Sequence, residues 1–293
     1  MIIGDCRKEL PTIKEVMERS VRLVFADPTF NWNRDYDRQK TGRAWDDKMA
    51  DDAYIAFTRE WLDLCIDALT DDGSLWVNIP DDWAAEIVMH CKGRGLDMVN
   101  WCIWHYRFGQ NTSSRFINSK VHALYFAKDR ANRIWHPERV LEVSDRRAVY
   151  NDPRTENKCD GVPAGMRTPM DVWYGPFWGR IQGNNKERRQ AHDNQLPEKY
   201  LERVILACSE EGDTVLDPFI GSGTTAVVAR EYNLNFVGTE YANQIAQSAF
   251  ERCRDVGMLR KCGALGASTA IAPKRGRLAR HGAATSPRSE ELG

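Results

Sequence analysis

The sequence predicts an α/β protein built on a doubly wound, mostly parallel β-sheet. Segments that resemble strands alternate with segments that resemble helices, the pattern of a sheet covered by helices on both faces. One predicted strand runs straight into a glycine-rich turn and an apolar helix, within residues 214–225. Acidic residues recur where predicted strands end. With 293 residues, the chain has room for one large domain and an inserted module.

Hydrophobic periodicity and turn residues divide the chain into elements. Apolar residues at helical spacing predict a long helix that ends before Asp71-Asp72-Gly73. In chain order, the expected elements are strands 1–5 and 22–26, helix 52–69, strand 74–79, helix 81–91, strands 99–106 and 122–127, helix 196–208, strand 215–216, helix 224–232 and strand 235–239.

The turn Gly221-Ser222-Gly223 is the strongest indication of a ligand site. Glycines let a backbone approach a ligand closely, and the free N–H groups of the helix that follows favour an anionic group. Seventeen residues after Gly223, the next strand ends in Glu240, where nucleotide-binding folds hold ribose hydroxyls. A tight turn without a ligand is the alternative. The turn lacks the third glycine of G-x-G-x-x-G and the Gly-Lys-Ser/Thr of a phosphate-binding loop, so an ATPase is not indicated.

Four acidic residues follow the ends of four separate strands: Asp5, Asp27, Asp217 and Glu240. Loops at the carboxyl ends of parallel strands lie at the same edge of a sheet. We therefore expect these carboxylates to converge on one crevice.

Composition excludes several classes of protein. A hydrophobic content of 42% suffices for a core, and no apolar run reaches membrane-spanning length. The N-terminus carries no secretory pattern, so we expect a cytoplasmic protein without a membrane partner. The eight cysteines form no C-x-x-C pair or His/Cys cluster, which predicts reduced core thiols and no metal site.

Residues 130–190 lose the regular alternation and carry twelve Lys/Arg against eight Asp/Glu. Basic residues interleaved with aromatic ones suit phosphate contacts and base stacking, whereas a small loop-rich core would use the same aromatics. The aromatic residues of this region are Trp135, Tyr150, Trp173, Tyr174, Phe177 and Trp178. After about residue 260 the Gly/Ala/Arg-rich composition predicts disorder.

Two motifs carry a family resemblance. The stretch D-P-F-I-G-S-G-T-T at 217–225 resembles the S-adenosylmethionine motif of DNA amino-methyltransferases. Asp27-Pro28-Thr29-Phe30 resembles their catalytic loop Asp-Pro-Pro-Tyr/Phe, with Thr29 in place of the second proline. The catalytic loop precedes the cofactor loop, as in the β class. The resemblance, which covers about residues 1–255, implies a seven-stranded, Rossmann-like methyltransferase sheet with an inserted, loop-rich recognition region.

This resemblance assigns parts to the chain. Residues 1–129 would be the catalytic half of the domain, 130–190 a target-recognition insert, 191–259 the cofactor-binding half and 260–293 a basic tail. The implied contacts to S-adenosylmethionine are Asp5, Cys6, Asn194, Gln195, Asp217, Pro218, Phe219, Gly221, Ser222, Gly223, Thr224, Thr225 and Glu240. The implied DNA contacts are Arg115, Trp173, Lys186, Arg188 and Arg189.

The chemistry of amine methylation explains the catalytic loop. The lone pair of an exocyclic amine is delocalised into its base, so the amine is a poor nucleophile. The Asp27 carboxylate and the Pro28 carbonyl would accept its two protons and direct the lone pair towards the methyl donor. Phe30 would stack on a base flipped out of the duplex, and Thr29 completes the loop.

The sequence thus predicts a DNA methyltransferase that uses S-adenosylmethionine on double-stranded DNA. Adenine N6 is preferred over cytosine N4, because Asp27 rather than serine opens the loop. A DNA-binding protein without turnover is the alternative that Thr29 suggests, and an oxidoreductase is a distant third. Methylation at cytosine C5 is not indicated, because no Pro-Cys pair occurs. A cognate restriction endonuclease, and a monomer or homodimer, are left open.

Overall fold

A computed structural model describes residues 1–34, 45, 47–106, 109, 111–155, 162–175, 178–179, 181, 187–188 and 194–261. Its centre is an eight-stranded sheet in the order β1-β10-β9-β2-β3-β5-β4-β8. The strands are β1 (Ile2–Ile3), β2 (Val21–Ala26), β3 (Leu69–Ile79), β4 (Asp97–His105), β5 (Lys120–Ala127), β8 (Val172–Trp173), β9 (Thr214–Asp217) and β10 (Asn235–Glu240). A separate pair joins β6 (Glu142–Val143) to β7 (Met166–Arg167).

The sheet is mostly parallel, as the sequence predicts. The pairs β1–β10, β10–β9, β9–β2, β2–β3 and β4–β8 are parallel, whereas β5 is antiparallel to both of its neighbours. Parallel strands are covered by helices on both faces and therefore have continuous apolar runs. The run Val21–Ala26 fits this rule, since only Arg22 is not fully buried.

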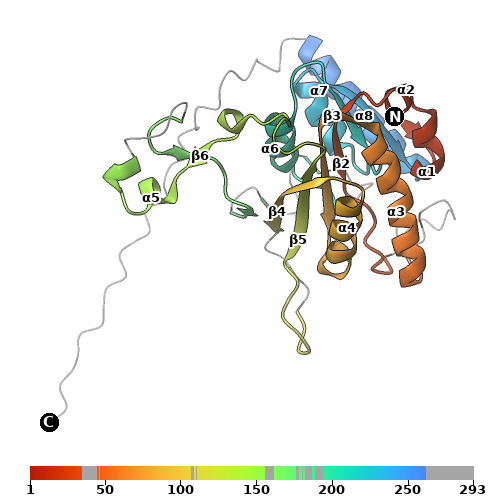
Figure 1. The fold of residues 1–293 in the computed structure, drawn as a ribbon, viewed down its shortest axis with the longest axis horizontal. Coiled ribbons are helices and arrows are strands. Elements are labelled where there is room, and N and C mark those ends of the chain that lie inside the picture. Colours follow the sequence, from red (N-terminus) through yellow and green to blue (C-terminus); the bar gives the residue numbers. More distant parts are fainter. Residues whose placement is uncertain are drawn as a thin grey trace.

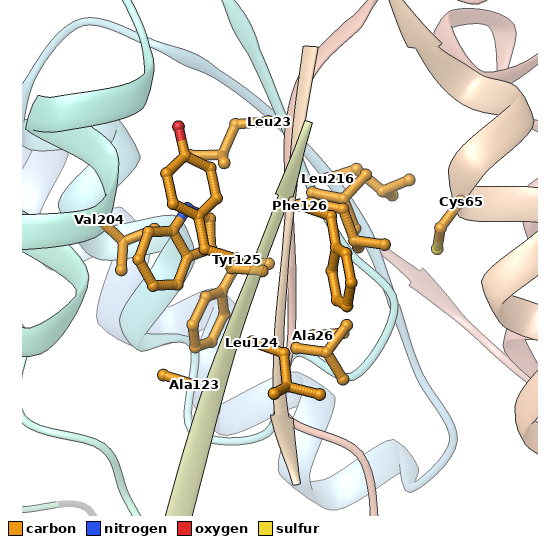
Figure 2. Packing of buried hydrophobic residues seen from close by; sticks show 14 of the residues in the cluster. Leu23, Ala26, Cys65, Ala123, Leu124, Tyr125, Phe126, Val204 and Leu216 are labelled. Atoms are coloured by element: carbon orange, nitrogen blue, oxygen red, sulfur yellow. The ribbon is translucent and has the colours of Figure 1, made fainter. Parts of the chain in front are cut away.

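Helices cover both faces of the sheet (Figure 1). Figure 2 shows Val204 of one helix beside Tyr125, and Cys65 of another on the opposite side of the sheet with Phe126. Successive residues of β5 therefore point to opposite layers of the core. The helices are α1 (Cys6–Glu9), α2 (Lys14–Met17), α3 (Asp51–Ala68), α4 (Asp81–Gly93), α5 (Asp145–Ala148), α6 (Glu198–Cys208), α7 (Thr224–Glu231) and α8 (Asn243–Lys261), with short 3₁₀ turns at Leu10–Thr12, Pro137–Arg139 and Pro153–Thr155.

The fold class agrees with the sequence, with two differences in detail. The sheet has eight strands rather than seven, and the strands at its two edges, β1 and β8, have only two residues each. The long helix ends at Ala68, and Asp71-Asp72-Gly73 lie inside β3, where the pairing with β2 changes register. The expected disorder beyond 260 falls almost wholly outside the described residues. Within them, no helix is long and apolar enough to cross a membrane.

Part of the predicted insert belongs to the main sheet. Val172–Trp173 pairs with Ile103–Trp104 of β4, and the Ile103 amide donates to the Asp171 carbonyl at 2.7 Å. Trp173 is 4% exposed and packs on Trp76 and Tyr200. The β6–β7 pair and α5 lie apart from the sheet (Figure 1). The structure thus supports the small-core alternative for the buried aromatics of this segment.

Candidate active site

A pocket opens at the carboxyl ends of β1, β2, β9 and β10. It measures about 1080 Å³ including its open mouth. Asp5, Asp27, Asp217 and Glu240 all line it, which confirms the predicted convergence of four carboxylates. The residues from Asp27 to Phe30 share the pocket with the glycine-rich turn, so the two motifs, almost 200 residues apart in the sequence, form one site.

Left-handed backbone shapes the glycine-rich turn. Gly221 has φ 52° and Gly223 has φ 78°, where residues with a side chain are strained. The Gly221 amide lines the pocket and donates to Glu240 Oε2 at 2.9 Å. A β-carbon on Gly223 would lie 2.9 Å from Ala249 Cβ of α8. Gly223 therefore serves the packing of the turn against α8, and it is not among the described residues that line the pocket.

A buried arginine stabilises this turn through hydrogen bonds. Arg252 of α8 is 2% exposed and donates to the Ser222 carbonyl at 3.1 Å and to Thr224 Oγ1 at 3.0 Å. It also pairs with Glu198 at the start of α6. Thr224 Oγ1 in turn lies 3.3 Å from the Leu196 carbonyl, which it can reach as a donor. The turn is thereby fixed to two helices before any ligand binds.

Glu240 and Asp5 are held in fixed orientations at the pocket wall. Glu240 accepts hydrogen bonds from the amides of Gly221 and Ala242, each at 2.9 Å, while burial raises the pKa of its carboxyl group. Asp5 caps α1 and accepts two side-chain hydrogen bonds from Arg7, at 3.1 and 2.7 Å. Arg7 lowers the pKa of Asp5. Asp5 therefore stays ionised at neutral pH.

Asp217 is a buried acid of the pocket whose pKa is strongly raised. Its side chain is 2% exposed, and burial raises its pKa to about 7. Hydrogen bonds from Thr225 and from the Phe219 amide oppose this shift, whereas the nearby charges of Asp27 and Glu240 add to it. A carboxyl group that titrates near neutral pH responds to any charge that enters the pocket.

The loop after β2 is held by aromatic side chains from two helices. The Tyr54 hydroxyl of α3 donates to the Thr29 carbonyl at 2.6 Å, and Trp83 Nε1 of α4 donates to the Phe30 carbonyl at 3.0 Å. The Phe30 ring is 9% exposed and meets Trp32 edge-to-face at 5.2 Å. The loop is thus fixed through its carbonyl groups, independently of the side chain at position 29.

Asp47 fixes the segment that follows this loop. Its carboxylate accepts hydrogen bonds from the amides of Asn31, Trp32 and Arg34 at 2.9, 3.1 and 3.0 Å. Its carbonyl accepts the amide of Asn33 at 2.8 Å. Asn31 and Asn33 have φ values of 56° and 57°, so this backbone alternates through the left-handed region. The 2% exposed carboxylate satisfies the convergent N–H groups that this conformation creates.

The structure places most of the predicted site residues together. The catalytic set, Asp27, Pro28, Thr29 and Phe30, lines the pocket. So do the predicted cofactor residues other than Gly223 and Gln195, namely Asp5, Cys6, Asn194, Asp217, Pro218, Phe219, Gly221, Ser222, Thr224, Thr225 and Glu240.

Three of the predicted site residues lie away from the pocket lining. Gly223 faces α8, as described above. Gln195 is 1% exposed and donates through Nε2 to the Glu187 carbonyl at 2.6 Å, away from the pocket lining. Trp173 is wrong as a DNA contact, because its ring is buried in the aromatic core.

The predicted DNA-contact cations fall into two groups. Arg115 is exposed on the loop between β4 and β5, and Arg188 is partly buried. Lys186 and Arg189 lie outside the described residues.

Several pocket residues were missed from the sequence. Trp45 and Tyr241 meet edge-to-face at 5.4 Å at the pocket, and Arg34 also lines it. Tyr241 directly follows Glu240, so its position after a strand end could have identified it. Asp47 belongs to no motif, and its role depends on a chain path that local patterns do not reveal.

Known proteins are similar to most of this chain. The N6/N4 DNA methylase family model matches residues 21–251. The type II methyltransferase M.HpaI of Haemophilus parainfluenzae is 28% identical over 249 residues, which cover 84% of this chain and 72% of that protein. The type II methyltransferase M.BamHI of Bacillus amyloliquefaciens is 32% identical over 82% of this chain, but the match spans only 54% of M.BamHI.

Solved structures share the fold. The M1.HpyAVI–SAM complex matches with a TM-score of 0.57 at 17% identity, covering 86% of this chain and 97% of that one. The cytosine-N4-specific PvuII DNA methyltransferase matches with a TM-score of 0.60 at 15% identity, covering 88% and 90%. The family model spans most of the sheet and both pocket motifs. The chain therefore belongs to the N6/N4 DNA methylase family.

Proposed function

We propose that this DNA methylase transfers a methyl group from S-adenosylmethionine to the exocyclic amine of a flipped base in double-stranded DNA, with adenine N6 as the preferred acceptor. The observation that carries the proposal is the shared pocket of the Asp27–Phe30 loop and the glycine-rich turn. Catalysis by positioning needs the acceptor groups and the methyl donor within one enclosed site.

The donor set of the pocket fits S-adenosylmethionine. Glu240 offers carboxylate oxygens to ribose hydroxyls at the end of β10. Trp45, Phe219 and Tyr241 offer aromatic walls to a purine. Asp5 and Asp217 give the pocket negative charge that attracts a cationic ligand. When bound, S-adenosylmethionine supplies an electrophilic methyl group.

The residues of the loop act on the acceptor amine. Asp27 accepts one amine proton as a hydrogen bond, and the Pro28 carbonyl accepts the other. Tyr54 and Trp83 hold the carbonyls of Thr29 and Phe30, so the two acceptors stay aligned. Phe30 packs on the base. No base catalyst is required before the methyl group moves, because the amine becomes nucleophilic through its orientation and its hydrogen bonds.

Asp27 supports adenine as the acceptor, because serine at this position accompanies cytosine N4 in the related family. The decisive experiment is mass spectrometry of nucleosides from DNA of cells that express the chain. We expect N6-methyladenine. Detection of N4-methylcytosine would support a DNA methyltransferase but refute adenine as the acceptor base. Unmodified DNA would refute the proposed activity.

We expect Thr29→Pro to change the transfer rate only modestly. Thr29 Oγ1 is buried without a hydrogen-bond partner, so the substitution breaks no hydrogen bond of the hydroxyl group. Stiffening a loop is worth only about 0.4–1 kcal/mol. Single-turnover methyl transfer measures the effect, with Thr29→Val as the control that removes the hydroxyl and keeps the backbone N–H. A wild-type enzyme that is inactive beside an active Thr29→Pro variant would contradict this expectation.

We expect S-adenosylmethionine to release protons as it binds near pH 7. Asp217 has a pKa of about 7 in the free protein, so about half of the molecules carry the proton at that pH. A cation in the pocket favours the carboxylate and lowers this pKa. Calorimetry in buffers of different ionisation enthalpy measures the release.

S-adenosylhomocysteine lacks the sulfonium charge and is the matched ligand control; it should release fewer protons. Asp217→Asn should remove the release that depends on this carboxyl group. Equal proton release by the two ligands would show that the sulfonium does not act on Asp217.

The DNA partner is proposed to contact cationic side chains outside the catalytic pocket, one exposed and one partly buried. Arg115, on the loop between β4 and β5, and Arg188 are the described candidates among the predicted contacts. Such contacts bind phosphates without reading sequence. The proposed partners also include a restriction endonuclease that acts on the same DNA site. The enzyme itself is proposed to be a monomer or a homodimer.

A further inference from the structure

The loop between β4 and β5 projects beyond the edge of the sheet (Figure 1). Pairing of the two strands continues to His105 and Lys120, and the Tyr106 amide then donates to the Ser119 carbonyl at 3.0 Å. A β-carbon on Gly109 would lie 2.1 Å from Ile117 Cγ2, so the two arms of the loop are in close contact. The described residues of this loop therefore form a hairpin whose two arms touch beyond the paired ends of β4 and β5.

The end of this hairpin carries an unusual side chain. Phe116 is 98% exposed, more than any other large hydrophobic residue in the described part of the chain. Ile117 beside it is 45% exposed. The neighbouring backbone is ordered locally, because the Ser114 amide donates to Thr112 Oγ1 at 3.2 Å. Exposure alone does not assign a role to this ring, but it leaves the ring available for contact with a partner.

The hairpin and the segment that directly follows the catalytic loop line the same groove. The groove measures about 2490 Å³ including its open mouth. Asn31, Trp32 and Arg34 line one part of it, and residues of the hairpin line another, namely Gly109, Asn111, Thr112, Ser114, Arg115 and Asn118, next to which Phe116 lies in the sequence. Arg34 also lines the catalytic pocket, so the groove and the pocket adjoin.

The charges of the hairpin suit a polyanion. Arg115 is the described cation of the hairpin that lines the groove, Lys120 at the base of the hairpin pairs with Asp81, and the sequence from residue 106 to residue 120 has no Asp/Glu. The carboxylates of the groove, Asp51, Asp82 and Glu86, belong instead to α3 and α4 on the other wall. A nucleic-acid strand in the groove would therefore have its phosphates towards the hairpin.

From this arrangement we propose that Phe116 enters the base stack of the DNA duplex and fills the space that the flipped base leaves. A duplex that loses a base from its stack exposes apolar base faces, and proteins insert apolar side chains as wedges at such steps. The ring lies on the hairpin that borders the groove, and the groove leads to the pocket where the base is methylated. This inference rests on the proposed function.

The test compares Phe116→Ala with wild-type enzyme on two kinds of DNA. Both contain the target site, found by mapping the positions that the wild type methylates. In one the target base is paired, and in the other it is mismatched and already loosely stacked. We expect Phe116→Ala to lower the rate on the paired site by about tenfold or more, and to change the mismatched site far less, because a mismatch already lowers the cost of flipping.

A duplex with 2-aminopurine at the target position gives a readout without turnover. Its fluorescence rises when the base leaves the stack, and this rise should be smaller with Phe116→Ala. Phe116→Trp should restore it, because an aromatic ring is retained. Phe250→Ala is the matched control, since Phe250 is 60% exposed on α8.

Three results would overturn the proposal. An equal loss of methylation rate on paired and mismatched sites would show that Phe116 contributes to DNA binding in general rather than to base flipping. An unchanged rate and fluorescence would show that the ring is dispensable. A wild-type dimer that becomes a monomer in Phe116→Ala, by sedimentation, would assign the ring to a second copy of the chain. A wild type that methylates no DNA would overturn the proposed function, whereas an active wild type with an indistinguishable Phe116→Ala overturns this inference alone.

Discussion

Replacing Asp27 with alanine should abolish methyl transfer while leaving the affinity for S-adenosylmethionine nearly unchanged. Asp27 follows β2, whereas the groups that fit the cofactor come from α1, the β9–α7 turn and the end of β10. Loss of one preorganised polar group at a reacting centre costs about 10²–10³-fold in rate. Single-turnover transfer of a labelled methyl group measures the rate, and calorimetry measures the affinity.

Two variants sharpen this test. Asp27→Asn keeps the size of the side chain and removes its charge, which should also lower the pKa of Asp217, because the Asp27 charge helps to raise it. Asp52→Ala is the control, since Asp52 is exposed at the start of α3. An Asp27→Ala enzyme with the wild-type rate, or one whose cofactor affinity falls as far as its rate, would refute the role of Asp27 as acceptor.

The central strands could be predicted because their signals are local. β2 and β9 are apolar runs that end at Asp27 and Asp217, and a parallel sheet brings such ends to one edge. The Asp71-Asp72-Gly73 signal was misleading because it marks an irregularity within β3 rather than a turn. The edge strand β8 has two residues, and only its pairing with β4 defines it.

The site shows the same division between local and long-range information. The two motifs supply most of the pocket, because each motif is a contiguous strand end and loop. Trp173 was misplaced because its aromatic neighbours, Trp76 and Tyr200, come from distant parts of the chain. Asp47 was missed for the same reason: its partners at 31–34 surround it only after the chain has returned to the loop.

Asp47 should prove nearly as important for the rate as the residues that line the pocket. We expect Asp47→Asn to lower kcat by about 10²-fold, the cost of a small misplacement at a reacting centre. Its carboxylate accepts three amide hydrogen bonds, whereas asparagine has one acceptor oxygen and would turn its NH₂ group towards an N–H. An unsatisfied buried N–H costs about 1–3 kcal/mol, so the backbone at 31–34 should leave its left-handed conformation.

Separate measurements of kcat, cofactor affinity and melting temperature identify this role of Asp47. Since Asp47 holds the backbone that directly follows the catalytic loop, kcat should fall, while calorimetric affinity for S-adenosylmethionine and the melting temperature change little. A local rearrangement of one loop does not require global unfolding. Asp52→Asn is the matched control, because it makes the same substitution at an exposed acid. If Asp47→Asn instead lowered the melting temperature and the cofactor affinity together with kcat, Asp47 would stabilise the whole fold rather than the local backbone next to the catalytic loop.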